Sequence, residues 1–397
     1  MLKKIYKKIR CLGIEKRDNY KIELPVISPG PIKNIFNQQF KKKALVSFIT
    51  YAIKQPSENL SHTNILECKT ICNILNELEY NVDLIDYNNT ELNLENIYDV
   101  IIGFGYPIEN ILFHKQNKNY KLIVYRNGCD QSFSDQATLL RVEEVLKKTG
   151  KLLIKSSRIS PAYWRAQIRF ADIIIVLGNQ FVSGTYQNET SGKIISLDLF
   201  YYDVGTIDFE YKDFDLARKK FLWFGSLGAI HKGLDIAIEY FSSHHDLELF
   251  ICGLNLREED FIELYRQELA LPNIHNFGFV ELQSKEFKNI LNSCCAIITP
   301  SVSEGGAAAN LNVIAAGGLV PLITKSSGIS FDGNEIIIEE ITVSALNAAI
   351  DTFLKIPVQD LKKKSLSINK YVRDRYTFDN YKKNLRNIIS EEVHNRL

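Results

Sequence analysis

The stretch that most constrains the fold is residues 297–324, which have the pattern of a strand, a glycine loop, a helix, a turn and a second strand. Residues 295–299 are a short apolar run, typical of a strand buried on both faces, and Pro300 ends it. Residues 307–316 are rich in alanine, the best helix former, and the glycines at 317–318 stop the helix. The pattern predicts one unit of a parallel sheet covered by helices.

The loop between this strand and this helix contains Glu304, Gly305 and Gly306. Because glycine carries no side chain, the backbone can come close to a ligand there. Free N–H groups and the helix dipole also meet at this point, which suits phosphate or sugar oxygens. In an open parallel sheet the loop lies at the carboxyl ends of the strands, where ligands bind. A carboxylate repels phosphate, so Glu304 fits better as an acceptor of hydrogen bonds from sugar hydroxyls. The alternative is a solvated glutamate in an ordinary loop.

Residues 303–321 resemble the E-x7-E segment of retaining, nucleotide-sugar-dependent glycosyltransferases with the GT-B fold, the large group often called family 4. The resemblance implies that Glu304 contacts the donor sugar and that Asn312 lies at the ribose diol. It also implies that three backbone amides meet the sugar and the diphosphate: those of Gly305, Gly306 and Ala307. The family has a second glutamate where this chain has Asn312, and an amide lacks the charge-assisted strength of a carboxylate.

A second glycine loop, residues 225–235, follows the apolar run 220–224 and leads into a helix. It resembles the family's first loop, in which an Arg after the first glycine (here Gly225) and a Lys six positions further on clamp the diphosphate. Lys232 matches the Lys. Ser226 occupies the Arg position and cannot make the same bidentate contact. A lysine at a helix start is mildly unfavourable against the dipole, which argues for a bound anion; the alternative is an exposed lysine.

Two further turns are predicted on the same edge of the second half. Residues 247–251 form a predicted strand that leads to Gly253, and residues 273–277 form the next one. The resemblance implies that backbone around residues 278–280 meets the nucleobase, which makes Phe279 and Val280 donor-site candidates. The ring of Phe279 could stack on the base or fill the core, and we expect it in the core.

The first half also alternates strands with helices, which predicts a parallel, doubly wound sheet. The expected fold class is therefore α/β of the GT-B type: two Rossmann-like domains face a cleft, and C-terminal helices cross back to the first domain. The expected divisions are a basic tail and linker (1–40), an acceptor domain (41–205), an interdomain linker (206–219), a donor domain (220–358) and crossover helices (359–397).

Four residues of the first half are predicted to face the cleft and bind the acceptor. His62 and Asn64 lie at the expected start of the first long helix, and Arg126 and Asp130 follow the fourth expected strand. The alternative for His62 is a role in the helix-capping turn only. Gly103 begins a G-x-G that lacks the third glycine of a dinucleotide site, and the chain contains no P-loop motif, so neither nucleotide class is expected.

Composition excludes several classes of function. The net charge of +1 gives no overall field for nucleic acid, and no apolar run approaches the ~20 residues of a spanning helix. The seven scattered cysteines predict free thiols in a reducing cytoplasm. Asp213 and Asp215 form an Asp-x-Asp, but it follows no buried strand, so no metal is expected. Residues 1–21 are basic with apolar residues at helical spacing, which predicts either a solvated tail or peripheral contact with an anionic membrane.

The expected function is transfer of a sugar from a nucleoside-diphosphate sugar to a hydroxyl of a glycan or lipid-linked acceptor. The resemblance implies retention, a front-face mechanism and a cytoplasmic setting in bacterial surface polysaccharide synthesis, at or near the inner membrane. Lys232 and the loop amides would stabilise the leaving diphosphate, and Glu304 would orient the sugar; these two side chains are the predicted catalytic residues. No cofactor is expected beyond the donor co-substrate. The alternatives are a catalytically inactive GT-B scaffold, or an epimerase whose acid–base group would be His231, which we expect on the surface.

Overall fold

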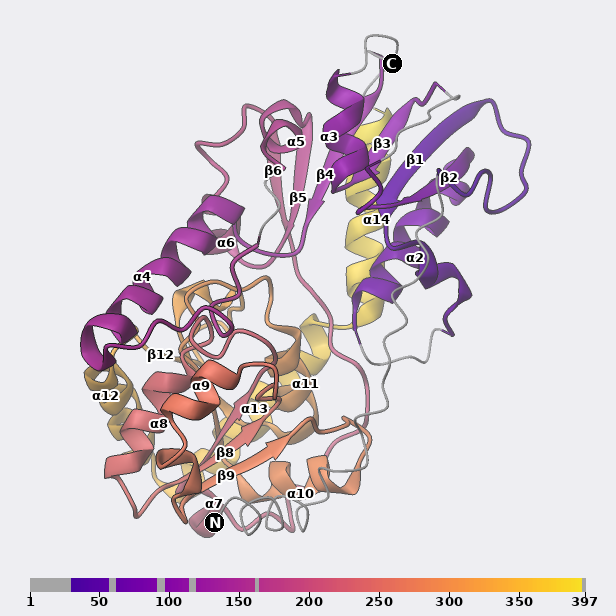
Figure 1. Ribbon diagram of the computed structural model, residues 1–397. Coiled ribbons are helices and arrows are strands. Elements are labelled where there is room, and N and C mark those ends of the chain that lie inside the picture. Colours follow the sequence, from indigo (N-terminus) through magenta and orange to yellow (C-terminus); the bar gives the residue numbers. More distant parts are fainter. Residues whose placement is uncertain (1–29, 57–61, 91–96, 114–118, 161–163, 395–397) are drawn as a thin grey trace.

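Each half of the chain forms a six-stranded sheet in which all strands run parallel. The structure is a computed structural model that describes residues 30–56, 62–90, 97–113, 119–160 and 164–394. The basic segment 1–21, with its predicted membrane contact, lies outside the described residues. Figure 1 shows the two sheets as separate layers, one above the other, with helices around each.

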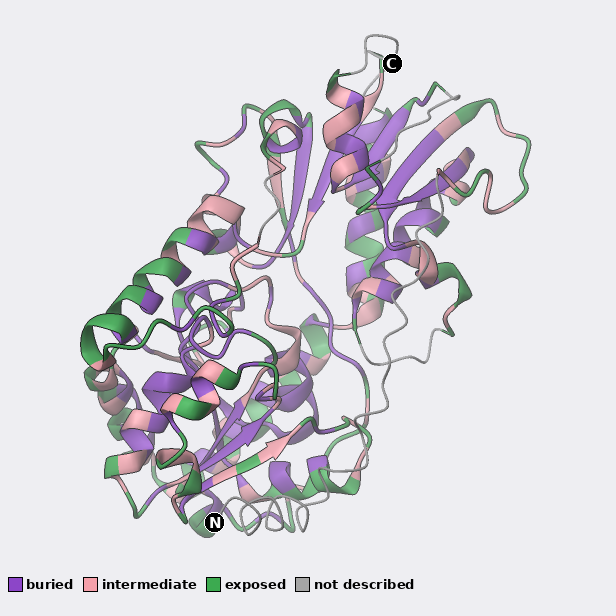
Figure 2. Cartoon of the chain, viewed as in Figure 1, coloured by how far each residue is buried: buried purple, intermediate pink, exposed green. Residues whose placement is uncertain are grey.

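The first sheet has the strand order β2-β1-β3-β4-β5-β6. Alternate residues of β5 pack into two separate apolar clusters, Ile173 with Ile175 in one and Ile174 with Val176 in the other, so both faces of the sheet are covered. This explains the continuous Ile and Val run of β5, all of whose residues are buried (Figure 2). The strands are β1 (Lys42–Phe48), β2 (Tyr80–Asp86), β3 (Val100–Gly103), β4 (Lys121–Arg126), β5 (Ile173–Leu177) and β6 (Lys193–Leu197).

The helices of the first half are α2 (Asn64–Glu77), α3 (Tyr106–Phe113), α4 (Gln131–Thr149), α5 (Arg165–Phe170) and α6 (Gln180–Gly184), with a 3-10 turn at Thr50–Lys54. Helix α4 extends beyond its own sheet and lies against the second half (Figure 1). Its buried Arg141 forms an ion pair with Asp235, and the hydroxyl of Thr138 lies 2.8 Å from Nδ1 of His231. One helix of the first half therefore contacts both halves of the molecule.

The second sheet has the order β12-β11-β10-β7-β8-β9. Its central strands β7 and β10 are neighbours although two strands separate them in sequence, so the connections leave in opposite directions on either side of this pair. The strands are β7 (Lys220–Phe224), β8 (Glu248–Cys252), β9 (Ile274–Gly278), β10 (Ala296–Thr299), β11 (Val320–Ile323) and β12 (Ile336–Ile337). The helices are α7 (Phe214–Ala217), α8 (Leu234–Ser243), α9 (Glu259–Leu264), α10 (Lys285–Ser293), α11 (Ala308–Gly317) and α12 (Val343–Leu354), with 3-10 turns at Glu268–Ala270 and Lys325–Ser327.

Two long C-terminal helices join the halves as predicted. Helix α13 (Val358–Arg375) packs on α11 and β11 of the second half, and α14 (Phe378–His394) packs on α2 and β6 of the first. The hydroxyl of Tyr381 in α14 lies 2.9 Å from that of Tyr125 in β4. The α/β fold class, with two Rossmann-like sheets and crossing C-terminal helices, is confirmed.

Local pattern located several strands well and the short helices less well. The strands β6 and β7 begin and end at the expected residues. The short helix α7 was not expected, because its Asp-x-Asp was assigned to a linker. The side chain of Asp213 caps this helix by accepting a hydrogen bond from the amide of Leu216 at 3.0 Å. Such four- to six-residue helices depend on a cap and on tertiary contacts rather than on a sustained apolar period.

Candidate functional site

The loops that follow β7 and β10 form the centre of the candidate site. These strands pair with each other in the middle of the second sheet, so both loops lie at the carboxyl edge where the strand order reverses. In open α/β sheets a ligand crevice forms at this reversal, because the helices that follow the two strands diverge. The sequence motifs at residues 225–235 and 303–306 thus come together although they are far apart in the chain.

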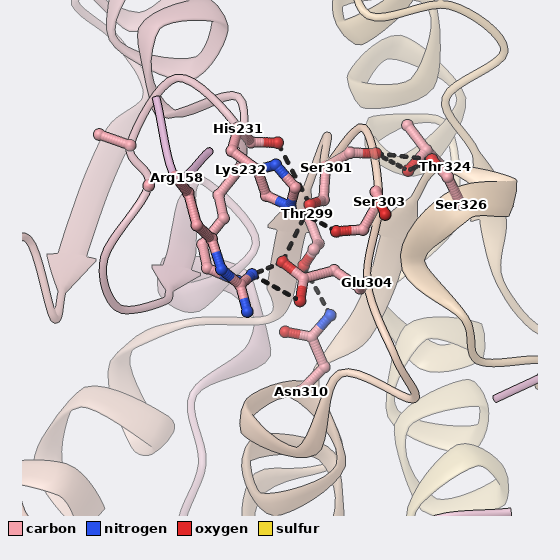
Figure 3. Close-up of polar contacts among 12 residues, drawn as sticks. Arg158, His231, Lys232, Thr299, Ser301, Ser303, Glu304, Asn310, Thr324 and Ser326 are labelled. Carbon is pink, nitrogen blue, oxygen red and sulfur yellow. Dashed lines mark hydrogen bonds and ion pairs between the residues drawn. The ribbon is translucent and has the colours of Figure 1, made fainter. Parts of the chain in front are cut away.

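Lys232 and Glu304 form an ion pair between the two loops (Figure 3). Both side chains are nearly buried, 12% and 10% exposed, and the hydroxyl of Ser301 also donates to the same carboxylate oxygen at 3.0 Å. The backbone amide of Glu304 donates to the carbonyl of Ser326 at 2.9 Å, which fixes the loop to the one after β11. The two predicted catalytic residues therefore lie in direct contact, with the Ser301 hydroxyl beside them.

Arg158 is a second cation on the same carboxylate. Its Nη1 lies 3.5 Å from Oε2 of Glu304, and its side chain remains half exposed (Figure 3). The residue belongs to the first half of the chain, in the connection between α4 and α5, and its φ of 55° is in the left-handed region. Arg158 was not predicted as a site residue, since no motif surrounds it and only the packing of the two halves brings it to the site.

The charge state of Glu304 follows from these neighbours. Burial by itself raises the pKa of a carboxyl, but Lys232 and Arg158 outweigh it and hold the pKa of Glu304 well below its usual range. Burial lowers the pKa of Lys232, and the charge of Glu304 opposes that shift. The pair is therefore ionic at neutral pH, and Glu304 can accept hydrogen bonds but cannot donate a proton.

His231 is buried rather than on the surface, so the expectation for this residue was wrong. Its Nε2 donates to the carbonyl of Ser303 at 2.5 Å, and Nδ1 faces the hydroxyl of Thr138 in α4. Burial lowers its pKa to about 3, so the imidazole is neutral at pH 7. The histidine connects three segments: α4, the loop after β7 and the loop after β10.

Glu258 is a buried carboxylate near the site that was not predicted from the sequence. It accepts hydrogen bonds from the backbone amides of Gly228 and Ala229, the latter at 3.2 Å, in the loop after β7. Burial raises the pKa of Glu258, and these two amides oppose the shift. The carboxylate of Glu258 thus occupies two amides of the glycine loop. Lys232, in the same loop, pairs with Glu304 instead.

The glycine loop after β10 lies against the first half. A Cβ at Gly305 would overlap the carbonyl of Asn127, and the thiol of Cys129 donates to the carbonyl of Glu304 at 3.7 Å. Gly306 and Ala307 both have left-handed φ angles, 74° and 34°, immediately before α11. The three candidate amides at 305–307 therefore lie in a tight turn, and the loop after β4 packs against this turn.

Asn312 is buried, and its amide is already engaged. Its Oδ1 accepts a hydrogen bond of 2.7 Å from the backbone amide of Tyr202, in the segment that joins the two sheets. This contact holds the connecting segment on α11. The carboxamide oxygen in this structure thus serves the protein backbone, while its predicted role at a ribose stays a prediction.

Glycines form the rim above β7, β8 and β9. The amide of Gly253 donates to the carbonyl of Gly278 at 2.6 Å, and a Cβ at Gly253 would overlap the carbonyl of Gly225. Phe279 is 70% exposed, so the expectation that its ring fills the core was wrong, whereas Val280 is buried. Ser226 is exposed in the same rim.

The predicted acceptor residues of the first half form two groups. His62 is near Arg158: although the histidine keeps an open face to solvent, the surrounding protein and then the charge of Arg158 lower its pKa. Its Nδ1 accepts from the amide of Asn64 at 3.2 Å. Arg126 donates to the hydroxyl of Tyr186 at 3.4 Å, and Asp130 caps α4 through the amide of Ser132 at 2.9 Å. Arg126 and Asp130 also line a small cavity beside Trp164 and Glu189.

The remaining predictions concern thiols, metals and membranes. The six cysteines among the described residues are free and buried. Within the described ranges, no group of three or more His, Cys, Asp and Glu side chains is arranged to hold a metal ion. In the same part of the chain, no helix combines the length and apolar character needed to cross a membrane.

Residues 208–375 match a family model described as glycosyl transferases group 1. The match covers less than half of the chain but includes both loops of the site. A search of curated proteins found no match to the sequence.

Solved structures resemble most of the chain, across both halves. Sucrose-phosphate synthase from Thermosynechococcus elongatus has a TM-score of 0.61 at 11% identity, over 88% of this chain and 98% of that one. A glycosyltransferase from Rickettsia africae has a TM-score of 0.54 at 14% identity, over 89% of this chain and 99% of that one. Anabaena Alr3699/HepE, in complex with UDP and glucose, has a TM-score of 0.52 at 11% identity, over 88% of this chain and 99% of that one. At these identities the likeness shows the fold, which is GT-B.

Proposed function

We propose that this protein transfers a sugar from a nucleoside-diphosphate sugar to a hydroxyl acceptor. One observation carries the proposal: the ionic pair of Lys232 and Glu304 joins two glycine loops at the point of strand reversal in the second sheet. A cation, a carboxylate and tight backbone turns are the groups that a sugar diphosphate requires. The family match of the same loops to group 1 glycosyl transferases supports this proposal.

The two charged residues would have different roles in transfer. Lys232 would neutralise the charge that grows on the leaving diphosphate, an electrostatic effect that is strong because this lysine is nearly buried. Glu304, which is ionised, would accept hydrogen bonds from hydroxyls of the donor sugar and so fix its position. Neither role needs a proton from Glu304.

The stereochemical outcome in this proposal is retention, with the leaving phosphate assisting removal of the acceptor proton. The chemistry of the neighbouring groups supports it. The imidazole of His231 is buried and makes hydrogen bonds through both nitrogens, so it has no free position for proton transfer. Burial raises the pKa of the Cys129 thiol to about 11, which keeps it from acting as a thiolate nucleophile. These properties also argue against an epimerase that uses His231.

Donor entry in this proposal requires the first half to move. Asn127 lies on Gly305 so closely that even a Cβ would not fit between them, and a sugar diphosphate is far larger. The loop after β4 must therefore separate from the loop after β10 before the donor binds, and then close again. The acceptor would reach the sugar from the first half, where His62, Arg126 and Asp130 are the candidate contacts.

The proposed setting is bacterial glycan or glycoconjugate synthesis at the cytoplasmic face of the inner membrane. The basic segment 1–21 supports peripheral contact with an anionic surface. Flotation with anionic liposomes checks it: the full chain should bind more than a variant without residues 1–21, and equal, negligible binding of both would contradict it.

A second candidate function is nucleotide or glycan binding without catalysis. Two observations favour it: Ser226 replaces an Arg in the resemblance, and the Oδ1 of Asn312 is engaged by Tyr202. Both features should lower the affinity for a nucleotide. The two candidates differ in turnover, so binding alone does not separate them.

The test has two stages. Calorimetry with UDP, GDP and ADP and their sugar conjugates should find one base-selective ligand that Lys232→Ala no longer binds. Proton NMR should then follow the same sugar nucleotide after a hydroxyl acceptor is added. The anomeric configuration of the product, compared with that of the donor, reports retention or inversion. Binding without turnover would support the second candidate, and failure of every nucleotide to bind would overturn the proposal.

A further inference from the structure

The connection between α4 and α5 rests on the second half of the molecule. The backbone amide of Lys155 donates to Asp260 at 2.7 Å, and its side chain forms an ion pair of 2.6 Å with Glu259, the first residue of α9. A Cβ at Gly228 would come within 2.9 Å of the Cβ of Arg158, so the stem of Arg158 packs on the loop after β7. These contacts fix Arg158 at the entrance of the candidate site.

The guanidinium of Arg158 is available to a ligand. The Lys232 side chain is 12% exposed, whereas that of Arg158 is 49% exposed. The distance of 3.5 Å between Nη1 and Oε2 of Glu304 is longer than a good charge-assisted hydrogen bond. The planar fork of an arginine carries five N–H donors that suit the paired oxygens of phosphate. The guanidinium can therefore turn from Glu304 to an anion beside it with little loss.

The local charges favour such an anion. Lys232 and Arg158 face the single carboxylate of Glu304. The other carboxylate near Lys232, that of Glu258, is directed to the amides of Gly228 and Ala229. His231 adds no charge near neutral pH, because burial lowers its pKa to about 3. Glu304 can thus satisfy one of the two cations that meet on it, and the other has capacity for a bound phosphate.

We propose that Arg158 is a donor-binding residue that the first half of the chain contributes to a site otherwise built by the second half. Its guanidinium binds the diphosphate of the donor together with Lys232 and so supplies a cation that Ser226, at the Arg position of the resemblance, does not offer. This inference rests on the proposed function and deepens it. The anion site is complete only when the connection that carries Arg158 lies on α9 and on the loop after β7, so donor binding and closure of the two halves favour each other.

The experiment measures nucleotide affinity by calorimetry, with UDP, GDP and ADP, for the wild type and for Arg158→Ala, Arg158→Gln and Arg158→Lys. The nucleotide that binds the wild type best should bind the Ala and Gln variants about ten- to a hundredfold more weakly, since charge-assisted hydrogen bonds are lost. Arg158→Lys should have an intermediate affinity. Lys151→Ala is the matched control, because Lys151 is an exposed cation of the same connection; its affinity should stay within about twofold.

Chemical rescue separates ligand contact from a merely structural role. Methylguanidinium added to Arg158→Ala should restore part of the affinity for the nucleoside diphosphate, and it should not do so for Lys232→Ala. If the ion pair of Arg158 and Glu304 only held the halves together, its loss in Arg158→Ala would lower the unfolding temperature of the nucleotide-free protein and leave the nucleotide affinity unchanged. The melting curve of each variant, without nucleotide, therefore accompanies each titration.

The outcomes are distinguishable. If the wild type binds none of the nucleotides, the proposed function fails and the role of Arg158 fails with it. If the wild type binds but the Ala and Gln variants bind equally well, the role of Arg158 is refuted and the proposed function stands. If the Ala variant does not fold, the Gln and Lys variants decide the question by the same affinities.

Discussion

Two buried glutamates, one in each half of the molecule, have opposite electrostatic surroundings. Glu304, in the loop after β10, faces Lys232 and Arg158, and its pKa is held well below the usual range. Glu67, in α2, is 1% exposed and receives hydrogen bonds from the hydroxyls of Thr63 and Tyr125. Burial raises the pKa of Glu67 to about 7, and these two hydroxyls only partly oppose the shift.

The difference shows what a buried carboxyl needs in order to remain charged. Hydroxyl donors satisfy the oxygen atoms of Glu67 but do not offset the cost of burying its charge. Two cations do offset that cost at Glu304. The cations at Glu304 are also the groups that an anionic ligand would use, so we interpret the Glu304 cluster as a binding site and the Glu67 cluster as part of the packing between α2, β4 and α14.

The largest effect should come from removing the main cation beside Glu304. Lys232→Ala should reduce sugar transfer by about a hundred- to a thousandfold, because the leaving diphosphate loses its buried positive partner. Steady-state kinetics measures this loss, with the sugar nucleotide that calorimetry shows to bind the wild type. Lys325→Ala removes an exposed lysine from a neighbouring loop and is the control. Similar rates for Lys232→Ala and the control would contradict the role of Lys232.

The comparison also predicts a pH effect at Glu67. In the folded protein its pKa is about 7, above the unfolded value near 4.5, so the folded state retains a proton that the unfolded state loses between these values. The contribution to stability is therefore full below pH 4.5 and is lost as the pH rises through 7, by about 3 kcal/mol in total.

Glu67→Gln should remove this pH dependence. Urea unfolding at pH 5 and pH 8 should show the wild type losing about 2.5 kcal/mol more than the variant over that range, because part of the total is already lost at pH 5. Comparing the wild type with the variant at each pH cancels the contributions of the other titrating groups. One of these is His231, whose lowered pKa makes stability rise with pH, opposite to the effect of Glu67. Parallel profiles for the wild type and the variant would mean that Glu67 is not the group with the raised pKa.

A smaller effect sharpens the role of the hydroxyls near Glu67. Tyr381→Phe removes a hydroxyl 2.9 Å from that of Tyr125 and leaves the ring in place. We expect a loss of about 1 kcal/mol in the free energy of unfolding, typical of one buried hydrogen bond, and unchanged affinity for nucleotides. Denaturant unfolding and calorimetry measure the two quantities, and a drop in affinity would show that this cluster belongs to the binding site after all.

The smallest effect is expected at Phe279, on the rim of the second half. Its ring is 70% exposed, so Phe279→Ala should change the free energy of unfolding by less than about 0.5 kcal/mol. If the ring stacks on the base, nucleotide affinity should fall about fivefold. Leu366→Ala, at an exposed apolar residue of α13, is the matched control. Equal affinity for the two variants would remove Phe279 from the donor site.

Much of the fold could be predicted because its signals are local. The strand β7 is an apolar run followed directly by Gly225. The strand β10 is an apolar run that Pro300 ends, and Gly305 and Gly306 follow in its loop, so the sheet and both loops follow from spacing. Lys232 and Glu304 could be selected because each lies within a few residues of these glycines. Their direct contact, by contrast, depends on the pairing of β7 with β10, which the sequence pattern does not specify.

The groups that prediction missed are those placed by tertiary contacts. Arg158 comes from the other half of the chain, and Glu258 reaches the loop after β7 from the loop after β8. His231 was expected at the surface because a polar residue beside a lysine is usually exposed; its burial results from the packing of α4 on this loop. Phe279 was expected in the core because large aromatic residues usually are, yet it lies on the rim.

Hydrogen–deuterium exchange with mass spectrometry tests the central claim, that the donor binds between the loops after β7 and β10. The measurement compares the protein alone with the protein saturated by the nucleoside diphosphate that binds it most tightly. We predict the strongest slowing of exchange in peptides that cover residues 225–233 and 300–308, with a smaller effect in residues 154–160. Slowing confined to the first sheet, or no slowing in either loop at saturation, would contradict the account.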